Sequence, residues 1–308
     1  MSIVVAGDTG LVGSAIFELL KSKREDVIGL NSKTVNLLDR QATFDFIADI
    51  KPDAVIDAAA IVGGIGANNT FPVDFLSKNL QIQTNLMDAA HNANVERFVF
   101  LGSSCIYPRE CPQPMKEEFL LTGPLESTNS AYAIAKIAGI ELIRSYRKQF
   151  KRRWISLMPT NMYGPNDNFS LESGHVLPSL INRFVSAARN GNREVTLWGS
   201  GNPRREFLHS QDLAKATVFL MEKYDDDSHI NVGTGEDLPI NELARLIADG
   251  AGFNGEIKWD SSKPDGTLRK LLDVSRIRSL GWSPTITLEE GIRLTIEWFK
   301  QNESKVRV

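Results

Sequence analysis

The sequence contains little cysteine or histidine and no long hydrophobic run, and each scarcity excludes a class of protein. Two cysteines in 308 residues, Cys105 and Cys111, are too few for a disulfide framework. The histidines are scattered without the spacing of metal ligands, so we expect no metal site. No apolar run approaches the roughly 18 residues that a membrane span requires, and the first residues lack the pattern of a signal peptide. These absences predict a cytoplasmic protein without a membrane partner.

Charge excludes a further class. The formal net charge is -3, and no block of lysine and arginine dominates any segment. General binding to nucleic acid is therefore not expected, and an anionic ligand would need a local cluster of cations. Apolar residues make up 42% of the chain and charged residues 24%, an ordinary composition for a globular enzyme with one large domain or two.

Strands and helices are predicted to alternate through the first half of the chain. Short apolar runs, each followed by a helical pattern, indicate buried strands at 2–6, 26–30, 54–60, 97–102 and 154–159. This alternation predicts an α/β fold with a Rossmann-type doubly wound parallel sheet. After Tyr163-Gly164-Pro165 the rhythm is lost. We therefore expect a nucleotide-binding domain over 1–165 and a smaller C-terminal α+β substrate domain over 166–308, parts of which return to the sheet.

A glycine-rich turn follows the first predicted strand. Gly7, Gly10 and Gly13 have the spacing G-x-x-G-x-x-G and open a helix, where free N–H groups can bind a pyrophosphate. A purely structural turn is the alternative. After the second strand the sequence reads Leu-Asn-Ser-Lys, without the carboxylate that binds the ribose 2′-hydroxyl of NAD. Because Ser32 and Lys33 can donate to a phosphate, we predict a preference for NADPH, unless Lys33 is an ordinary surface lysine.

A serine, a tyrosine and a lysine suggest hydride-transfer chemistry. Tyr132 and Lys136 are four residues apart on a predicted helix and share a face. Of the five tyrosines, only Tyr132 has a lysine at the fourth following position. We expect the lysine to lower the pKa of the tyrosine and Ser103, at a strand end, to bind the same carbonyl oxygen. A chance pair on a surface helix is the alternative.

These residues are typical of the extended short-chain dehydrogenase/reductases, and further motifs resemble the GDP-L-fucose synthases among them. The resemblance rests on Gly-Ser-Ser-Cys-Ile-Tyr-Pro at 102–108, Tyr-Ala-Ile-Ala-Lys at 132–136, Pro-Thr-Asn-Met-Tyr-Gly-Pro at 159–165, Trp-Gly-Ser-Gly at 198–201 with Arg-Glu-Phe-Leu-His at 205–209, and Lys-Pro-Asp-Gly at 263–266 with Arg-Lys-Leu-Leu-Asp at 269–273. It spans essentially the whole chain. The family epimerises C3 and C5 of GDP-4-keto-6-deoxy-D-mannose and reduces C4 with NADPH, which yields GDP-L-fucose.

The resemblance implies that Cys105 and His175 are the epimerisation pair. Both C3 and C5 are next to the C4 ketone, so each can lose a proton as an enolate forms, and inversion needs a base and an acid on opposite faces. A thiol and an imidazole can fill those roles. The alternatives without a catalytic role are that Cys105 is a small core residue and that His175 is an ordinary surface histidine.

The remaining implied sites follow from the same motifs. With NADP(H) as cofactor, the expected contacts are Gly7, Thr9, Gly10, Leu11, Val12, Gly13, Ser32, Lys33, Leu101, Gly102, Ser103, Ser104, Lys136, Pro159, Asn161, Met162 and His175. The expected contacts of the GDP-sugar are Arg183, Trp198, Arg205, Asp265 and Lys270. Thr9 and Ser32 replace arginines of better-known members, which weakens the expected grip on the 2′-phosphate. By analogy, helices near 77–93 and 130–149 would build a homodimer.

Two other functions compete with this interpretation. A nucleotide-sugar 4-epimerase or 4,6-dehydratase has the same fold, but a dehydratase would be expected to carry acidic residues where this chain has Ser104-Cys105-Ile106. A catalytically silent NADP-binding sensor would be expected to lack the Tyr132/Lys136 pair.

Overall fold

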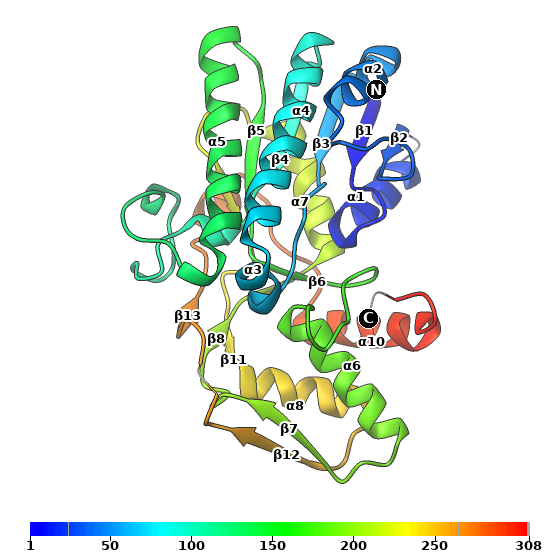
Figure 1. Cartoon of the computed structure of the whole chain (residues 1–308), viewed down its shortest axis with the longest axis vertical. Helices are drawn as coiled ribbons and strands as arrows, with labels where there is room; N and C mark the ends of the chain where they lie inside the picture. Colours follow the sequence, from blue (N-terminus) through cyan, green and yellow to red (C-terminus); the bar gives the residue numbers. More distant parts are fainter. Residues whose placement is uncertain (24, 264, 307–308) are drawn as a thin grey trace.

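Six parallel strands form the central sheet of the computed structural model, which describes residues 1–23, 25–263 and 265–306 (Figure 1). Across the sheet the order is β10 (Ile230–Val232), β5 (Ile155–Pro159), β4 (Arg97–Leu101), β3 (Ala54–Asp57), β1 (Ser2–Ala6) and β2 (Asp26–Leu30). Each neighbouring pair is parallel. The predicted Rossmann-type fold is confirmed, and the reversal of strand order beside β1 is where such sheets bind nucleotides.

Helices cover both faces of the sheet, which explains why its strands read as continuous apolar runs. One layer contains α2 (Arg40–Ile50), α4 (Asn79–Asn92) and α5 (Ser130–Phe150), and the other contains α1 (Leu11–Ser22) and α7 (Ser210–Lys223). All residues of β3, β4 and β5 are buried. The strands that the sequence predicted are therefore the centre of the main hydrophobic core.

Two local predictions differ from the structure. The third strand ends at Asp57 rather than at residue 60, and the helix expected near 77–93 starts earlier, with a π-helical turn, η1 (Asp74–Lys78), before α4. The Asn79 amide donates to the Phe75 carbonyl (2.7 Å) and to the Ile61 carbonyl (3.0 Å). This side chain therefore ties the irregular turn to the loop after β3, which the periodicity of the sequence cannot show.

A second, smaller core lies beyond the carboxyl edge of the sheet (Figure 1). It is built from α6 (Val176–Arg189), α8 (Ile240–Ala251), α10 (Leu288–Asn302) and the parallel pair β7 (Glu194–Trp198) and β12 (Glu256–Asp260). Short strands connect the two parts: β6 (Asn161–Tyr163) with β9 (Phe207–His209), and the trio β11 (Leu238–Pro239), β8 (Arg204–Arg205) and β13 (Arg269–Lys270). Strand β10 and helix α7 follow residue 166 in sequence yet belong to the main sheet and its core.

Several short elements lie around the carboxyl edge. They are α3 (Ile65–Thr70), α9 (Ser275–Ser279) and the 3-10 turns η2 (Ser104–Ile106), η3 (Glu117–Phe119) and η4 (Ser127–Asn129). Within the described ranges, no helix has both the length and the apolarity that crossing a membrane demands.

Candidate active site

The glycine loop between β1 and α1 has the shape of a phosphate cradle. Gly7 has φ +83°, and a Cβ there would lie 2.8 Å from the Ala58 carbonyl oxygen. A Cβ on Gly13 would lie 2.0 Å from the Gly7 carbonyl oxygen. Only glycine fits at these two positions, because the loop packs directly on itself and on the end of β3.

The beginning of α1 is open to an anion. Its N-cap residue, Gly10, makes no side-chain hydrogen bond to the helix. The first N–H groups of the 12-residue helix therefore remain available to donate to a ligand. Leu11 and Val12 form the first turn. The residues present therefore fit a dinucleotide pyrophosphate.

The end of β2 contains a feature that the sequence did not suggest. Ser32 and Lys33 are exposed, as a contact with the ribose end of a cofactor requires. Beside them, the Asn31 amide donates to the Asp8 carboxylate at 2.9 Å. Asp8 comes from the glycine loop, so the structure brings a carboxylate to the strand end where the linear sequence has none. An acidic residue inside the glycine motif was the only available signal.

The reducing set converges at the carboxyl end of β4. Ser103 caps the turn η2, and its hydroxyl accepts a hydrogen bond from the Cys105 N–H (3.2 Å) and interacts with the Tyr132 hydroxyl. Tyr132 is in the first turn of α5, and Lys136 is one turn later on the same face. The Lys136 ammonium is buried, donates to the Leu101 carbonyl at 2.9 Å and lies 5.9 Å from the centre of the Tyr132 ring.

The expected effect of the lysine on the tyrosine is wrong. Burial, followed by the nearby Cys105 sulfur, raises the pKa of Tyr132 above its ordinary value, and the Ser103 hydroxyl only partly opposes this rise. The ammonium of Lys136 bonds to a carbonyl and faces the ring rather than stabilising a phenolate. Tyr132 is therefore a neutral acid with a proton to donate.

Asp57 is a member of this group that the sequence analysis missed. It ends β3, is almost fully buried, and accepts a hydrogen bond from the Ala59 N–H (3.2 Å). Burial raises the pKa of Asp57 to about 6, and the Lys136 charge opposes the rise. Burial likewise lowers the pKa of Lys136 to about 8, and Asp57 opposes that change. The lysine thus has a buried carboxylate as its electrostatic partner, which an acidic residue at the end of an apolar strand could have indicated.

Cys105 lies in the same region as a free, half-buried thiol. Its sulfur accepts a hydrogen bond from the Asn129 amide at 3.3 Å. It is also close enough to Arg205 and to Tyr132 to influence the pKa of each side chain. The thiol is therefore next to both a cation and the predicted proton donor.

His175 is at the beginning of α6 and approaches from the other part of the molecule. It is solvent-accessible, yet surrounding protein atoms desolvate the imidazole and lower its pKa. The preceding loop is held to the sheet side, because the Ser173 carbonyl accepts from the Gly64 N–H at 3.0 Å. Helix α3 follows Gly64 and packs on η4, which carries Asn129 beside Cys105. One short segment, 64–70, thus supports the surroundings of both residues.

Cations from distant parts of the chain meet near the thiol. In the parallel pairing of β8 and β13, Arg205 is the register partner of Lys270. Both side chains are half-buried, and desolvation lowers the pKa of Arg205 while Cys105 opposes that change. Both residues are among the expected contacts of the GDP-sugar, and the structure brings their backbones side by side.

The other predicted substrate residues form a more open group. Trp198 is 75% exposed, with the Lys263 ammonium 5.7 Å from a ring centre. The exposed Asp265 carboxylate accepts hydrogen bonds from the Ser200 N–H (2.8 Å) and hydroxyl (2.7 Å). Arg183, on α6, donates to the Thr196 carbonyl at 3.4 Å. This group is held on the small part, away from the buried reducing set.

The remaining predicted cofactor residues follow the ends of β4 and β5. The Gly102 N–H donates to the Leu157 carbonyl at 2.8 Å, which joins the two strands where Ser104 begins η2. Pro159 ends β5, and Asn161 and Met162 form β6. The Asn161 amide donates to the Glu206 carbonyl at 2.8 Å, so this stretch links the sheet to the smaller part.

Comparison with known proteins identifies the family. A sequence profile of the NAD dependent epimerase/dehydratase family matches residues 3–233. The chain is 51% identical to GDP-L-fucose synthase 1 of Arabidopsis thaliana over 97% of this chain and 93% of that protein. It is 48% identical to the GDP-L-fucose synthase of Escherichia coli K12 over 99% and 98% of the two chains. A solved GDP-L-fucose synthetase from Naegleria fowleri bound to NADP superimposes with a TM-score of 0.93 at 32% identity, covering 100% and 95%.

The chain belongs to the NAD dependent epimerase/dehydratase family, among its GDP-L-fucose synthases. This confirms the resemblance on which the sequence analysis depended. The match covers nearly the whole length of the relatives, so both the glycine loop and the smaller part have counterparts in them. The solved relative contains NADP, the cofactor that the sequence predicted.

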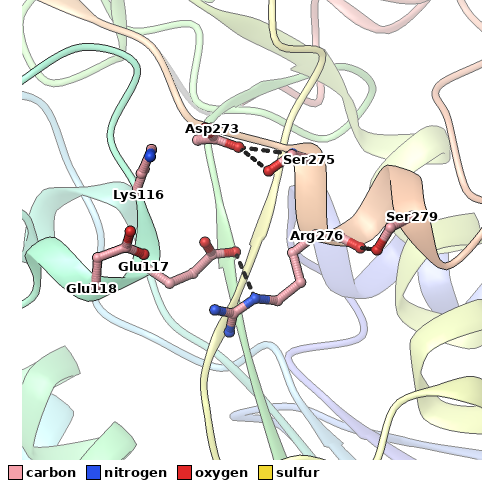
Figure 2. Close-up of a pocket in the computed structure, with 7 residues that line it drawn as sticks. All are labelled: Lys116, Glu117, Glu118, Asp273, Ser275, Arg276 and Ser279. Atoms are coloured by element: carbon pink, nitrogen blue, oxygen red, sulfur yellow. Dashed lines mark hydrogen bonds and ion pairs between the residues drawn. The ribbon is translucent and has the colours of Figure 1, made fainter.

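A charged hollow lies outside the residues assigned to the site. It has a volume of about 450 Å³ and is lined by Lys116, Glu117, Glu118, Asp273, Ser275, Arg276 and Ser279 (Figure 2). The Glu117 carboxylate accepts from the Asn231 N–H (3.1 Å) and pairs with Arg276 (3.8 Å). Burial raises the pKa of Glu117. These contacts fasten three chain segments at the edge strand β10, so we interpret the hollow as a structural junction.

Proposed function

We propose that this protein is a bifunctional epimerase-reductase that converts GDP-4-keto-6-deoxy-D-mannose to GDP-L-fucose with NADP(H). The observation that carries the proposal is the position of a free thiol. Cys105 is close enough to both the reducing residue Tyr132 and the cation Arg205 to influence the pKa of each. A plain ketone reductase has no use for a thiol there, whereas removal of a proton beside the ketone requires a base.

Epimerisation is assigned to Cys105 and His175. The thiolate of Cys105 removes a proton from C3 or C5, and His175 returns one to the opposite face. An imidazole exchanges its proton near neutral pH, which suits the return of a proton to carbon, and surrounding protein atoms lower the pKa of this imidazole by desolvation. The enolate oxygen at C4 accepts hydrogen bonds from Ser103 and from Tyr132, whose raised pKa keeps its proton in place.

Reduction uses the same two hydroxyl groups. When bound, NADPH supplies a hydride to C4. Tyr132 donates its proton to the oxygen that becomes a hydroxyl, while Ser103 orients that oxygen. The Lys136 ammonium places a positive charge over the Tyr132 ring, and the Asp57 carboxylate raises the pKa of this ammonium. One constellation therefore serves both steps in sequence.

The residues that the sequence predicts as contacts of the cofactor and of the GDP-sugar are assigned the same roles in this proposal. The glycine loop and the start of α1 would hold the pyrophosphate of the cofactor, and the ends of β4 and β5 with β6 would hold its nicotinamide half. Arg205 and Lys270 would bind the GDP diphosphate, supported by Arg183, Trp198 and Asp265. The two hydrophobic cores support a division of labour between a nucleotide part, 1–165 with returning segments, and a substrate part over 166–308.

A homodimer in the cytoplasm completes the proposal. Helices α4 and α5 lie side by side in the helix layer that also contains α2 (Figure 1). Helix α5 has exposed apolar side chains at Ile134 (48%) and Phe150 (44%). Pairing of these helices between two copies would cover such groups, and a monomer in sedimentation would contradict it. Both cysteines are free thiols, as a reducing compartment keeps them.

The test separates the two activities. Incubation with GDP-4-keto-6-deoxymannose and NADPH should oxidise the cofactor, and NMR should identify the L-fuco configuration in the product. Cys105→Ser should abolish exchange of solvent deuterium into C3 and C5 while a ketone at C4 is still reduced. Cys111→Ser, a second free thiol, is the matched control and should behave as the wild type. Undiminished exchange in Cys105→Ser would remove this residue from the mechanism.

A further inference from the structure

The trio of short strands that carries the predicted diphosphate contacts has two pairs of cations. In the parallel register of β8 and β13, Arg204 is opposite Arg269, and we call these two residues the outer pair. The next positions, Arg205 and Lys270, form the inner pair. The outer pair is exposed, whereas the inner pair is half-buried. Because successive side chains of a strand point to opposite faces, the two pairs lie on opposite faces of this small sheet.

The inner pair lies close to the segment that begins with the proposed base. Burial lowers the pKa of Arg205, and the Cys105 sulfur is close enough to oppose that change. Burial raises the pKa of the Cys111 thiol, and Lys270 is close enough to oppose that rise. Both inner cations therefore face the segment 105–111, where the sugar end of the substrate would react.

One carboxylate joins the two arginines of the outer pair. Asp237, directly before β11, accepts a hydrogen bond from Arg204 Nε at 2.8 Å on one oxygen and a bond from Arg269 Nε on the other. The Arg204 guanidinium also donates to the Asp237 carbonyl at 2.7 Å. The Asp237 side chain is 3% exposed, although each arginine side chain is 44% exposed. A buried anion thus links β8 to β13 through both of its oxygens.

The charge of Asp237 compensates the charges of the outer pair. Burial acts to raise the pKa of Asp237, but hydrogen bonds and charges from Arg269 and Arg204 outweigh burial and lower the pKa. The carboxyl is therefore ionised at neutral pH. Without it, two guanidinium groups in register would repel each other across the ladder. The spacing of the inner pair, one position further along the same ladder, depends on this compensation.

Separate contacts hold the backbone around this link. The carboxylate of Glu206, the residue after β8, accepts from the Gly235 N–H at 2.7 Å and from the Leu272 N–H at 2.9 Å. Strand β11 also pairs with β8. These bonds hold the same three chain segments together without the Asp237 side chain. Loss of the Asp237 carboxylate should therefore leave the fold intact and alter the placement of the cations.

We propose that Asp237 is a positioning residue for the diphosphate of the substrate: by linking the two arginines of the outer pair, it sets the spacing and direction of the inner pair. This inference rests on the proposed function, because it concerns how the GDP end of that substrate is bound. Asp237 itself makes no contact with the substrate and takes no part in proton or hydride transfer.

Calorimetry with GDP tests the proposal without turnover. Asp237→Asn keeps the size of the side chain and removes its charge, and the Kd for GDP should rise by about 10-fold. Glu236→Gln changes the exposed carboxylate one residue earlier and should bind GDP as the wild type does. A purely electrostatic effect has the opposite sign, because removing an anion near the site would tighten GDP binding. Equal or tighter binding in Asp237→Asn would overturn the proposal.

A second variant separates geometry from charge. Arg204→Lys keeps the positive charge and loses the planar fork that bonds to Asp237. The Kd for GDP should rise again, by a smaller factor of about 3. Arg245→Lys, on the exposed face of α8, is the matched control and should leave the Kd unchanged. Equal Kd values for these two lysine variants would show that charge alone matters and would refute the positioning role.

Steady-state rates provide the last readout. In Asp237→Asn the KM for the GDP-sugar should rise with the Kd for GDP, while kcat and the KM for NADPH stay unchanged. A fall in kcat or a higher KM for NADPH would mean that the variant disturbs the whole site, which contradicts the proposal. If GDP binding weakens as expected but the GDP-sugar is not converted by the wild type, the proposed function fails and the role of Asp237 stands. Conversion with the same KM in both proteins would have the reverse meaning.

Discussion

The reducing centre and the substrate face of this protein are built in opposite ways. Lys136 is 3% exposed and has bonds or electrostatic contacts with Leu101 and Asp57, at the ends of two neighbouring strands. Trp198 is 75% exposed at the end of a strand in a two-stranded sheet. The difference shows that groups which act on single atoms need a rigid, desolvated setting, whereas a large charged nucleotide needs an accessible surface.

Removing the Tyr132 hydroxyl should produce the largest effect and break the reducing centre alone. In Tyr132→Phe we expect kcat for NADPH-dependent reduction to fall by about 10²- to 10⁴-fold, because the general acid is lost. Thermal unfolding should change little. Tyr146→Phe removes a hydroxyl from the same helix, where it donates to Asp88, and is the matched control. Equal kcat values for the two variants would contradict the role of Tyr132.

An intermediate effect is expected on the substrate side. Arg205→Met should raise KM for the GDP-sugar by about 10- to 100-fold, because charge-assisted hydrogen bonds to a diphosphate contribute about 1.5–3 kcal/mol. The KM for the nicotinamide cofactor should stay the same. Arg245→Met changes the same charge on the exposed face of α8 and should behave as the wild type. A fall in kcat without a change in KM would place Arg205 with the reducing centre instead.

The smallest effect should come from the partner of the lysine. The Asp57 carboxylate raises the pKa of Lys136 against the lowering by burial, and the pKa of Lys136 is about 8. Above pH 6 Asp57 is charged. Asp57→Asn removes this carboxylate, so the pKa of Lys136 should fall and the lysine should lose its proton at a lower pH. In the pH profile of the reduction rate, the decline on the alkaline side should therefore shift to lower pH by on the order of one unit. The exposed carboxylate Asp49 gives the control Asp49→Asn, and a limb that moves up or stays would refute the coupling.

Both parts of the site were predicted from local patterns to different extents. The apolar runs gave the central strands to within one to three residues, because a strand buried on both faces leaves a continuous signature. The glycine spacing and the Tyr132/Lys136 pair were also readable, since a turn and a helix face are short-range features. The pairing of Arg205 with Lys270, 65 positions later, was not, because two-residue strands have no periodicity to detect.

Partners brought in from other elements are what the linear pattern could not contain. Asp57 alters the charge balance around Lys136, and Asn129 orients the Cys105 thiol, although neither belongs to a recognised motif. The direction of the Tyr132 pKa depended on burial, which a neighbouring lysine in the sequence does not reveal.

The sequence by itself determined the fold class, the family and the chemical groups available for catalysis, since these depend on residue types at fixed short spacings. Only the tertiary structure decided which of these groups meet and how each is charged. It placed a neutral Tyr132 beside the thiol of Cys105, and it placed the carboxylate of Asp8 at the end of β2. The reason is physical: parallel pairing of strands and burial set distances and desolvation between residues that the chain itself keeps far apart.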